Sequence, residues 1–357
     1  DGIIDYQNGI CIPKNYLNKF KISPIGATLV CAEGGSAGRK IAYSLHECCY
    51  VNKLVSFQPN SKIIPKFLYY YSISAEFQLQ FKAALHGLIG GVSLTKMKKF
   101  AISYPSIPEQ ERIVAKLDAA FAEIDRARNR TSDSKANANS LYDICLKHVF
   151  GDFNYPDSSF TLADVTELIV DCEHKTAPTQ EAGIALVRTP NIKKGTLELD
   201  SAKRISQETY EVWTRRAKPA ADDLILAREA PAGNVGVVPK GEDVCLGQRT
   251  VLIRAKINLI HHQYLCYFLL HPDVQDSLLS KSRGATVQHV NLRDIRSLPI
   301  PQLPSIEHQI EKVRAFKTML TLRQRLIDAT TQKIQLIEQL KLAILTKELQ
   351  PSQNEAA

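Results

Sequence analysis

The chain has 357 residues, of which 44% are hydrophobic and 23% are charged, and its formal net charge is +8. These values are typical of a soluble globular protein with two or more domains. No run of about 18 apolar residues occurs, so the sequence predicts neither a membrane span nor a secretory signal, and we expect a cytoplasmic protein.

The charge is unevenly distributed. Residues 1–104 hold 12 Lys and Arg against 5 Asp and Glu, a balance of +7, whereas residues 152–283 hold 16 against 18. A polyanionic partner therefore suits the first block, and any basic surface on the second must be local. The eight cysteines form no CxxC pair and no metal-ligand spacing, which predicts reduced thiols in the core.

The first block predicts short strands followed by helices. We expect strands at residues 27–32 and 50–57, with the turn EGGSAG between them, and a helical segment at residues 66–85. A glycine-rich loop starts at Gly87. A long helix then covers residues 106–150, because small or apolar residues recur in alternating steps of four and three, as in a coiled-coil seam.

The ends of this helix carry the expected signals. Ser106 and Glu109 have the spacing of a capping box, and Gly151 suits the C-terminal end. The remainder repeats the same order of elements at greater length. It predicts strands at residues 185–189, 223–227 and 244–254, a helical segment at 262–279, and a second long helix from Ser305.

The internal repeat is the most informative feature. PSIP at Pro105 and PSIE at Pro304 lie 199 residues apart. Three further pairs of segments keep a similar spacing: 29–33 with 225–229, 49–55 with 245–251, and 67–70 with 264–267. Extended backwards, the alignment places Asp1 near Lys194, so we expect about 40 residues of the first repeat to be absent from this chain.

The predicted fold class is α/β. Two pseudo-repeated globular domains, residues 1–104 and 152–303, are separated by long helices in residues 105–151 and 304–357, which are expected to pair antiparallel with a globule at each end. From residue 113 to residue 148 a helix rises roughly 50 Å, or somewhat more than one turn of duplex DNA. This geometry suits a reader of two DNA sites, and it equally suits a two-headed protein scaffold.

Several segments resemble one family. PSIPEQERIVAKLD from Pro105, preceded by GGVSLTKMKKFAI, is similar to the characteristic junction of specificity (S) subunits of type I restriction–modification systems. The run RGATVQHVNLRDIRSLPIP from Arg283 resembles the same junction more fully. DCEHKTAP from Asp171 and VRTPNIKKGT from Val187 also resemble that family. The resemblance covers essentially the whole chain, although the second helix has His308 where the first has Glu109.

The resemblance implies a non-catalytic subunit with two target-recognition domains, each reading one half of a split double-stranded DNA sequence. It implies that the long helices bind two methyltransferase (M) subunits, and that restriction (R) subunits join through M. S-adenosylmethionine, ATP and Mg²⁺ would then be carried by these partners, and this chain would hold no cofactor or metal.

The residues themselves show no catalytic machinery. Adenine methyltransferases use a D/N/S-P-P-Y/F loop, which is absent, and the run EGGSAGRK does not satisfy GxxxxGK[ST]. Glu173-His174-Lys175 has the ExK spacing found in some nucleases, but no Pro-Asp strand precedes it. A self-sufficient nuclease is therefore the third reading, after a DNA specificity subunit and a scaffold.

The candidate DNA contacts are polar residues in loops and at strand ends, where donors could reach phosphates or base edges. Gln248 and Arg249 are equivalent in the repeat to Asn52 and Lys53, which predicts a common DNA-facing turn. The full set of candidates is Arg39, Lys40, Asn52, Lys53, Lys82, His86, His174, Lys175, Thr176, Arg188, Asn191, Arg228, Gln248 and Arg249.

Overall fold

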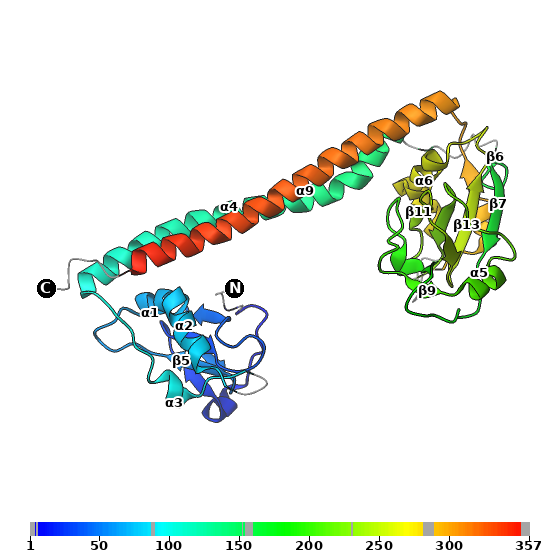
Figure 1. Cartoon of the computed structure of the whole chain (residues 1–357). Coiled ribbons are helices and arrows are strands. Elements are labelled where there is room, and N and C mark those ends of the chain that lie inside the picture. Colours follow the sequence, from blue (N-terminus) through cyan, green and yellow to red (C-terminus); the bar gives the residue numbers. More distant parts are fainter. Residues whose placement is uncertain are drawn as a thin grey trace. The chain divides into compact units, whose positions relative to one another are not determined.

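The computed structural model describes residues 4, 6–86, 90–151, 153, 160–229, 231–280 and 289–350. The chain divides into two compact units: unit 1 comprises residues 1–134 and 329–357, and unit 2 comprises residues 135–328. Each unit holds one globular domain and the adjoining parts of two 44-residue helices, α4 (Ile107–Phe150) and α9 (Ile306–Leu349) (Figure 1). The segments 87–89, 283–288 and 351–357 of the predicted loops and tail lie outside the described residues.

The globular domain of unit 1 combines small antiparallel sheets with short helices. One sheet has the strand order β3-β2-β5 and the other pairs β1 with β4. The elements are η1 (Lys14–Lys19), β1 (Lys21–Ser23), β2 (Thr28–Cys31), β3 (Ile41–Tyr43), β4 (Cys48–Tyr50), β5 (Leu54–Phe57), α1 (Pro65–Ser72), α2 (Ala75–Ala84) and α3 (Leu94–Met97).

Apolar side chains of β2 and β3 pack against α1 and α2. Val30, Ile41, Tyr71, Phe77 and Phe81 belong to one buried cluster. Two predicted elements of this domain are divided in the structure. The strand expected at residues 50–57 is broken by a turn, so that β4 pairs with β1 while β5 pairs with β2. The helix expected at residues 66–85 is broken at Ser74, whose hydroxyl accepts a hydrogen bond from Phe77 N (3.3 Å) and starts a second helix.

Unit 2 is larger and contains a four-stranded sheet, β11-β10-β13-β7, and a three-stranded sheet, β12-β8-β9. Its elements are β6 (Phe160–Thr161), β7 (Thr166–Asp171), β8 (Ile184–Val187), η3 (Thr189–Asn191), β9 (Lys203–Ile205), α5 (Gln207–Trp213), β10 (Leu224–Ala227), β11 (Val235–Val237), β12 (Val244–Leu246), β13 (Thr250–Ala255), α6 (His262–Leu270), α7 (Pro272–Leu279), α8 (Leu292–Arg296) and β14 (Pro299–Ile300).

One predicted strand of unit 2 is divided because its two halves belong to different sheets. The strand expected at residues 244–254 is two strands, because β12 runs parallel to β8 whereas β13 runs antiparallel to β10 and β7. The residues between them, 247–249, form a turn that carries the chain from one sheet to the other. The helix expected at residues 262–279 also divides, since Pro272 begins α7 with His271 as its N-cap.

The two long helices pair antiparallel in each unit. In unit 1, Lys116 pairs with Glu348 (2.8 Å) and Arg128 with Glu338 (3.0 Å), so residue numbers rise on one helix as they fall on the other. In unit 2, Arg323 Nε donates to Ala138 O (2.9 Å), and Lys312 Nζ donates to Val149 O (3.0 Å). The predicted seam is confirmed at its buried members, which include Ile113, Leu117, Ile124, Thr131, Ala138 and Cys145.

A buried glutamine fastens the start of each long helix to its own globular domain. Gln110 accepts a hydrogen bond from Ile64 N (2.8 Å), and its amide donates to Lys62 O and Pro105 O. Gln309 likewise accepts from His261 N (2.8 Å) and donates to two carbonyl oxygens. Both glutamines are fully buried. The glutamine therefore makes the two junctions equivalent despite the change from Glu109 to His308.

The predicted helix caps are only partly seen. His308 N donates to the Ser305 hydroxyl (3.4 Å), as expected of an N-cap. At the first helix, however, both carboxylate oxygens of Glu109 accept hydrogen bonds from Arg112, one turn along the helix, instead of closing a capping box with Ser106. Gly151 ends α4 with φ +80°, as predicted.

Candidate nucleic-acid interface

The turn between β12 and β13 is held tightly against the end of β8. Gly247 N donates to Val187 O (2.7 Å), and a Cβ at Gly247 would lie 2.5 Å from Arg188 Cγ. No larger residue fits there without displacing Arg188. The Thr250 hydroxyl donates to Gly247 O (2.7 Å) and closes the turn. As a result, Gln248 and Arg249 are exposed at the edge where the two sheets meet, with Arg249 at φ 68°.

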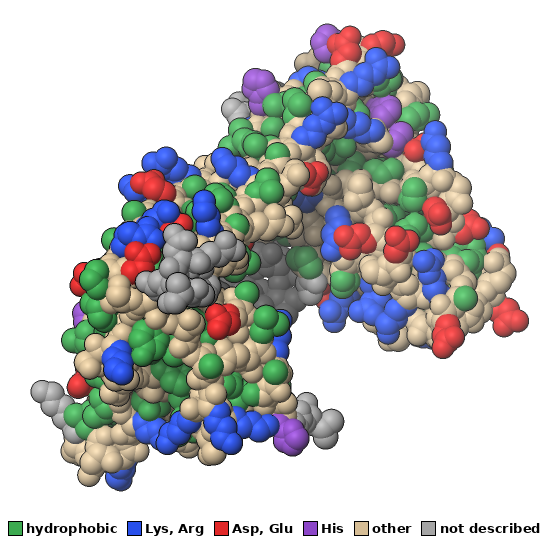
Figure 2. All heavy atoms as spheres, turned by 60° about the vertical axis from the view of Figure 1, so that its left-hand side comes forward, with side chains coloured by type: hydrophobic (Ala, Val, Ile, Leu, Met, Phe, Trp, Pro, Cys, Tyr) green, Lys and Arg blue, Asp and Glu red, His purple; other side chains and the backbone are tan. Residues whose placement is uncertain are grey.

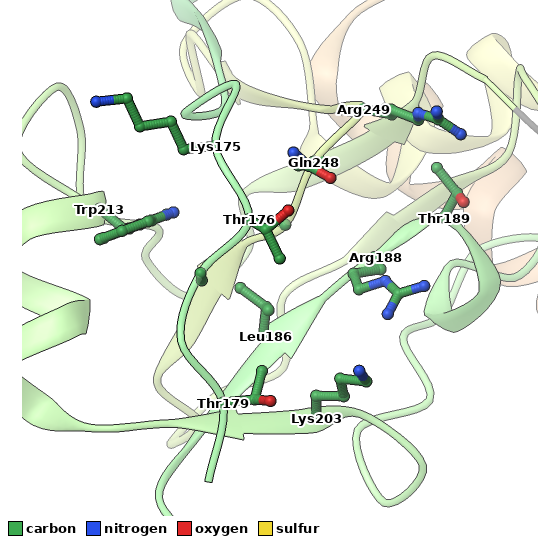
Figure 3. A pocket seen from close by; sticks show the side chains of 12 residues that line it. Lys175, Thr176, Thr179, Leu186, Arg188, Thr189, Lys203, Trp213, Gln248 and Arg249 are labelled. Atoms are coloured by element: carbon green, nitrogen blue, oxygen red, sulfur yellow. The ribbon is translucent and has the colours of Figure 1, made fainter.

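A polar hollow of about 300 Å³ lies beside this turn. Its lining comes from five separate segments: the loop after β7, the end of β8, strand β9, helix α5 and the 247–249 turn. In Figure 3, Lys175, Gln248 and Arg249 lie along one side, Thr179 and Lys203 along the other, and Arg188 lies between them. The fold thus brings together side chains that are distant in the sequence.

The hollow is basic. Lys175, Arg188 and Lys203 form no ion pair with the residues that the structure describes, whereas Arg249 Nε lies 2.9 Å from Glu229 Oε2. Gln248 Nε2 donates to His174 O (3.3 Å), which ties the turn to the loop after β7. Residues 152–283 have no net positive charge, but the surface of the hollow carries an excess of basic side chains.

A network of polar and charged side chains lies behind the hollow. Arg228 is 8% exposed, and its guanidinium contacts Asp171 Oδ2 (2.5 Å), His289 Nε2 (3.1 Å) and Val290 O (2.9 Å). His289 Nδ1 lies 2.5 Å from Glu229 Oε1, and Glu229 holds Arg249. The pairing compensates the cost of burying the Arg228 charge, and it fixes the ends of β7 and β10 relative to one another.

Two predicted DNA contacts lie inside the domain instead. Arg228 is engaged in the network just described. Asn191 is 7% exposed: its Oδ1 accepts from Arg188 N (3.1 Å), and its Nδ2 donates to Glu198 O (3.4 Å). The polar groups of both side chains already form hydrogen bonds within the domain. Neither residue is therefore placed to contact DNA. His174, Lys175, Thr176, Arg188, Gln248 and Arg249 are exposed, as a DNA contact requires.

Among the lining residues that were not predicted contacts, Lys203 and Trp213 have side chains suited to binding DNA. Lys203 projects from β9, and Trp213 is contributed by the end of α5. Lys203 could not be found from the sequence, because only the pairing of β9 with β8 places it beside Arg188. Trp213 is the only tryptophan of the sequence. Because aromatic rings stack on bases, the sequence did offer a reason to consider it as a DNA contact.

In unit 1, the predicted contacts are exposed and lie on four segments. Arg39 and Lys40 precede β3, Asn52 and Lys53 form the turn before β5, and Lys82 and His86 lie on and after α2. The predicted equivalence of the two turns is confirmed in the backbone: Ala32 N donates to Lys53 O (2.7 Å), and Arg228 N donates to Arg249 O (2.8 Å).

The glycine-rich turn at residues 33–38 is explained by packing. Gly38 has φ +71°, and a Cβ there would lie 2.5 Å from the Phe81 ring, so the position requires glycine. In the ExK tripeptide, Glu173 lies 3.9 Å from Arg216 and His174 lies 3.3 Å from Asp171. Among the described residues no cluster of three or more His, Cys, Asp or Glu side chains could hold a metal ion.

The buried thiols of unit 2 are not poised for chemistry. All eight cysteines are free, and Cys31, Cys145, Cys172, Cys245 and Cys266 are buried. Burial raises the pKa of Cys245 and of Cys266 to about 12, so both stay protonated and unreactive at neutral pH. Within the part of the chain that the structure describes, no helix has the length and apolar character needed to cross a membrane.

These features define a protein with two related α/β domains, each fastened to a pair of long helices and one of them carrying a basic hollow. The family described as "Type I restriction modification DNA specificity domain" matches residues 5–131 and residues 156–339. Because the two matches cover most of the sequence, the chain belongs to this family.

Known proteins agree with this assignment. The chain is 23% identical over 268 residues to the type I restriction enzyme EcoBI specificity subunit of Escherichia coli, and the match covers 68% of this chain. It spans only 56% of the length of that relative. A solved structure of a type I R-M system shares the fold, with a TM-score of 0.72 and 18% identity over 92% of this chain and 83% of the other. The HsdS subunit from Thermoanaerobacter tengcongensis has a TM-score of 0.54 and 20% identity over 92% and 82%.

Proposed function

We propose that the chain is a non-catalytic DNA specificity subunit, whose two domains each recognise one half of a split double-stranded target. The observation that carries the proposal is the hollow of unit 2, where Lys175, Arg188, Lys203 and Arg249 converge with Gln248 and Trp213 in a member of this family. We also propose a cytoplasmic location, because the proposed partner is DNA.

The residues of the hollow divide by chemistry into two kinds of contact. Lysines carry a point charge that attracts phosphates without reading sequence, so Lys175 and Lys203 would supply affinity. Arginine and glutamine present paired groups that match guanine and adenine edges in the major groove. Arg249 and Gln248, which the tight turn holds at the rim, would therefore supply sequence choice.

The long helices have surfaces suited to protein partners. Leu336 and Leu340 lie one turn apart on α9 in unit 1 and are 57% and 52% exposed. Leu322 and Leu326 have the same spacing in unit 2 and are 57% and 43% exposed. Figure 2 shows hydrophobic side chains among the charged ones along the helices.

Exposed leucines at helical spacing favour burial against another protein. We therefore propose that the helices bind two methyltransferase subunits, and that restriction subunits join through these. S-adenosylmethionine, ATP and Mg²⁺ would be bound by these partners and not by this chain.

The test is DNA binding by this chain together with a methyltransferase partner, measured on duplexes over a range of salt concentration. We expect binding to weaken steeply with salt, and Lys175→Ala or Lys203→Ala each to reduce the log–log slope by about 1. Lys240→Ala is the matched control, because Lys240 is 82% exposed and does not line the hollow. Absent or salt-insensitive binding would favour the protein scaffold, and DNA cleavage by the purified chain with Mg²⁺ would favour a nuclease.

A further inference from the structure

The backbone at Arg249 is fixed from both sides of its turn. Arg249 has φ 68°, and its carbonyl oxygen accepts a hydrogen bond from Arg228 N (2.8 Å). The hydroxyl of the next residue, Thr250, donates to Gly247 O (2.7 Å). The Arg249 side chain is 57% exposed, and in Figure 3 its guanidinium lies at the end of the hollow away from Trp213. The domain thus presents an arginine to solvent from a fixed backbone position.

The guanidinium of Arg249 is held by one edge. Its Nε lies 2.9 Å from Glu229 Oε2, and its two terminal nitrogens form no hydrogen bond with the residues that the structure describes. Guanine is read in the major groove by a pair of donors aimed at O6 and N7. The terminal nitrogens of an arginine form such a pair when the plane of the guanidinium is fixed. The ion pair also offsets the charge that would draw Arg249 to any phosphate.

Both oxygens of the Glu229 carboxylate are engaged. Oε2 contacts Arg249, and Oε1 lies 2.5 Å from His289 Nδ1. On the other side of the imidazole, His289 Nε2 lies 3.1 Å from Arg228 Nη2. Because a guanidinium can only donate, His289 Nε2 accepts, and Nδ1 carries the hydrogen that is donated to Glu229. The imidazole therefore fixes the orientation of the carboxylate that contacts Arg249.

Unit 1 repeats the carboxylate but not the side chains around it. Glu33 is the equivalent of Glu229 in the repeat. An isolated β-bridge joins Glu33 to Gly91, as another joins Glu229 to His289, so the backbone is arranged alike. Three side chains nevertheless differ between the units: Ala32 stands in place of Arg228, Gly91 in place of His289, and Lys53 in place of Arg249.

These differences accompany the change from arginine to lysine on the turn. A lysine ammonium is a point charge that needs no particular orientation to attract a phosphate, whereas an arginine reads a base only when its planar fork is aligned. Lys53 forms no ion pair with Glu33 among the residues that the structure describes. The oriented carboxylate is therefore found together with the side chain that requires orientation.

We propose that Glu229 and His289 are positioning residues for Arg249, and that the oriented guanidinium reads a guanine in the half-site recognised by unit 2. The inference rests on the proposed function, because it requires that the hollow faces DNA. His289 orients the Glu229 carboxylate, and the carboxylate holds the Nε edge of Arg249. The two terminal nitrogens then donate to O6 and N7 of the base. Glu229 and His289 act through Arg249 and need no contact with DNA of their own.

The test measures duplex DNA binding by this chain together with a methyltransferase partner. Selection from a random duplex library identifies the target, and the same selection with Arg249→Ala shows which guanine Arg249 contacts. That guanine is then replaced by 7-deazaguanine, which lacks the N7 acceptor and keeps the base pair. We expect the replacement to weaken binding by the wild-type chain about tenfold and to change binding by Arg249→Ala little.

Glu229→Ala and His289→Ala test the positioning itself. We expect each to reduce the 7-deazaguanine effect to about threefold or less, because the fork is no longer held in one plane. Binding of Glu229→Ala to unrelated duplexes should stay the same or strengthen, since a negative charge leaves the interface. Glu242→Ala is the matched control, because Glu242 is exposed and does not line the hollow, so the full effect should remain.

Three results would overturn the inference and leave the proposed function intact. The first is a wild-type complex that binds DNA without any guanine preference that Arg249→Ala removes. The second is an undiminished 7-deazaguanine effect in both Glu229→Ala and His289→Ala. The third is an equal loss of binding to all duplexes in these two variants together with a lowered Tm, which would show that the two residues only maintain the fold. A wild-type complex that does not bind duplex DNA would reject the proposed function and the inference together.

Discussion

Single buried side chains fix both junctions between domain and helix. Each of the equivalent glutamines, Gln110 and Gln309, satisfies one N–H and two carbonyl groups of the adjoining loops. Both glutamines are fully buried, and without the amide these backbone groups would lose their partners. The glutamine after PSIPE or PSIEH is therefore a structural residue, a role that its polarity alone did not indicate.

We expect Gln110→Ala to destabilise unit 1 by about 2–4 kcal/mol, because three hydrogen bonds of a fully buried side chain are lost. Urea denaturation of the full chain, followed by hydrogen exchange at residues 62–64, would measure the effect. Gln335→Ala is the control, since Gln335 is an exposed residue of α9. Similar unfolding of both variants would contradict the structural role of Gln110.

A second residue-scale prediction concerns His262. Burial lowers its pKa more than nearby Asp222 raises it, and His262 Nδ1 has no hydrogen-bond partner among the described residues. The folded state therefore takes up the proton less readily than the unfolded state. Stability contributed by the neutral ring is present above pH 6.5, the ordinary pKa, and is lost as the pH falls below it. We expect the urea midpoint of unit 2 to drop between pH 7.5 and pH 5.5, and to drop less in His262→Gln.

Arg249 is a predicted DNA contact that the structure leaves exposed. Its place in the repeat predicted a DNA-facing turn, and the structure holds it at the rim of the hollow beside Glu229. We expect Arg249→Ala to cost about 1–3 kcal/mol of discrimination at one base pair of one half-site only. Methylation mapping in cells that carry the whole system would measure it. An equal loss over unrelated sequences would show a phosphate contact instead.

At the scale of elements, sequence periodicity predicted the bounds of the long helices well and the bounds of the strands less well. Helix α4 begins and ends within one residue of the prediction, because its seam and its terminal Gly151 are local signals. The strands predicted at residues 50–57 and 244–254 each proved to be two, since a continuous apolar run does not show where the chain changes sheets. Only strand pairing reveals that Gly247 begins a turn there.

The exposed leucines of α9 are the expected contacts with a methyltransferase subunit. Changing Leu336 and Leu340 to Glu should weaken binding of a methyltransferase subunit by about 10- to 100-fold for each leucine, because each buried leucine contributes about 1.5–3 kcal/mol. Co-purification and titration calorimetry would measure the loss. The paired change of Gln335 and Gln339 to Glu adds the same charge at neighbouring exposed positions. If both pairs weaken binding alike, charge rather than apolar contact is responsible.

At the scale of the whole molecule, the boundary between the two units crosses both helices, after Ser134 and after Asp328. Seven-residue insertions at both boundaries would preserve the seam, since seven residues complete one heptad. Each lengthens its helix by about 10 Å, or about three base pairs of duplex DNA. If helix length sets the spacing of the two half-sites, methylation mapping should show a spacer longer by about three base pairs. An unchanged spacer would reject a ruler function.

The sequence by itself determined the duplication, the two long helices and the family resemblance, because heptad spacing, caps and repeated junctions are local along the chain. Only the tertiary structure decided which polar residues meet at one surface. It buried Asn191 and Arg228, and it added Lys203 and Trp213. The reason is physical: a hollow is made of side chains from separate strands, and their proximity depends on pairing and register, which hydrophobic pattern alone does not specify.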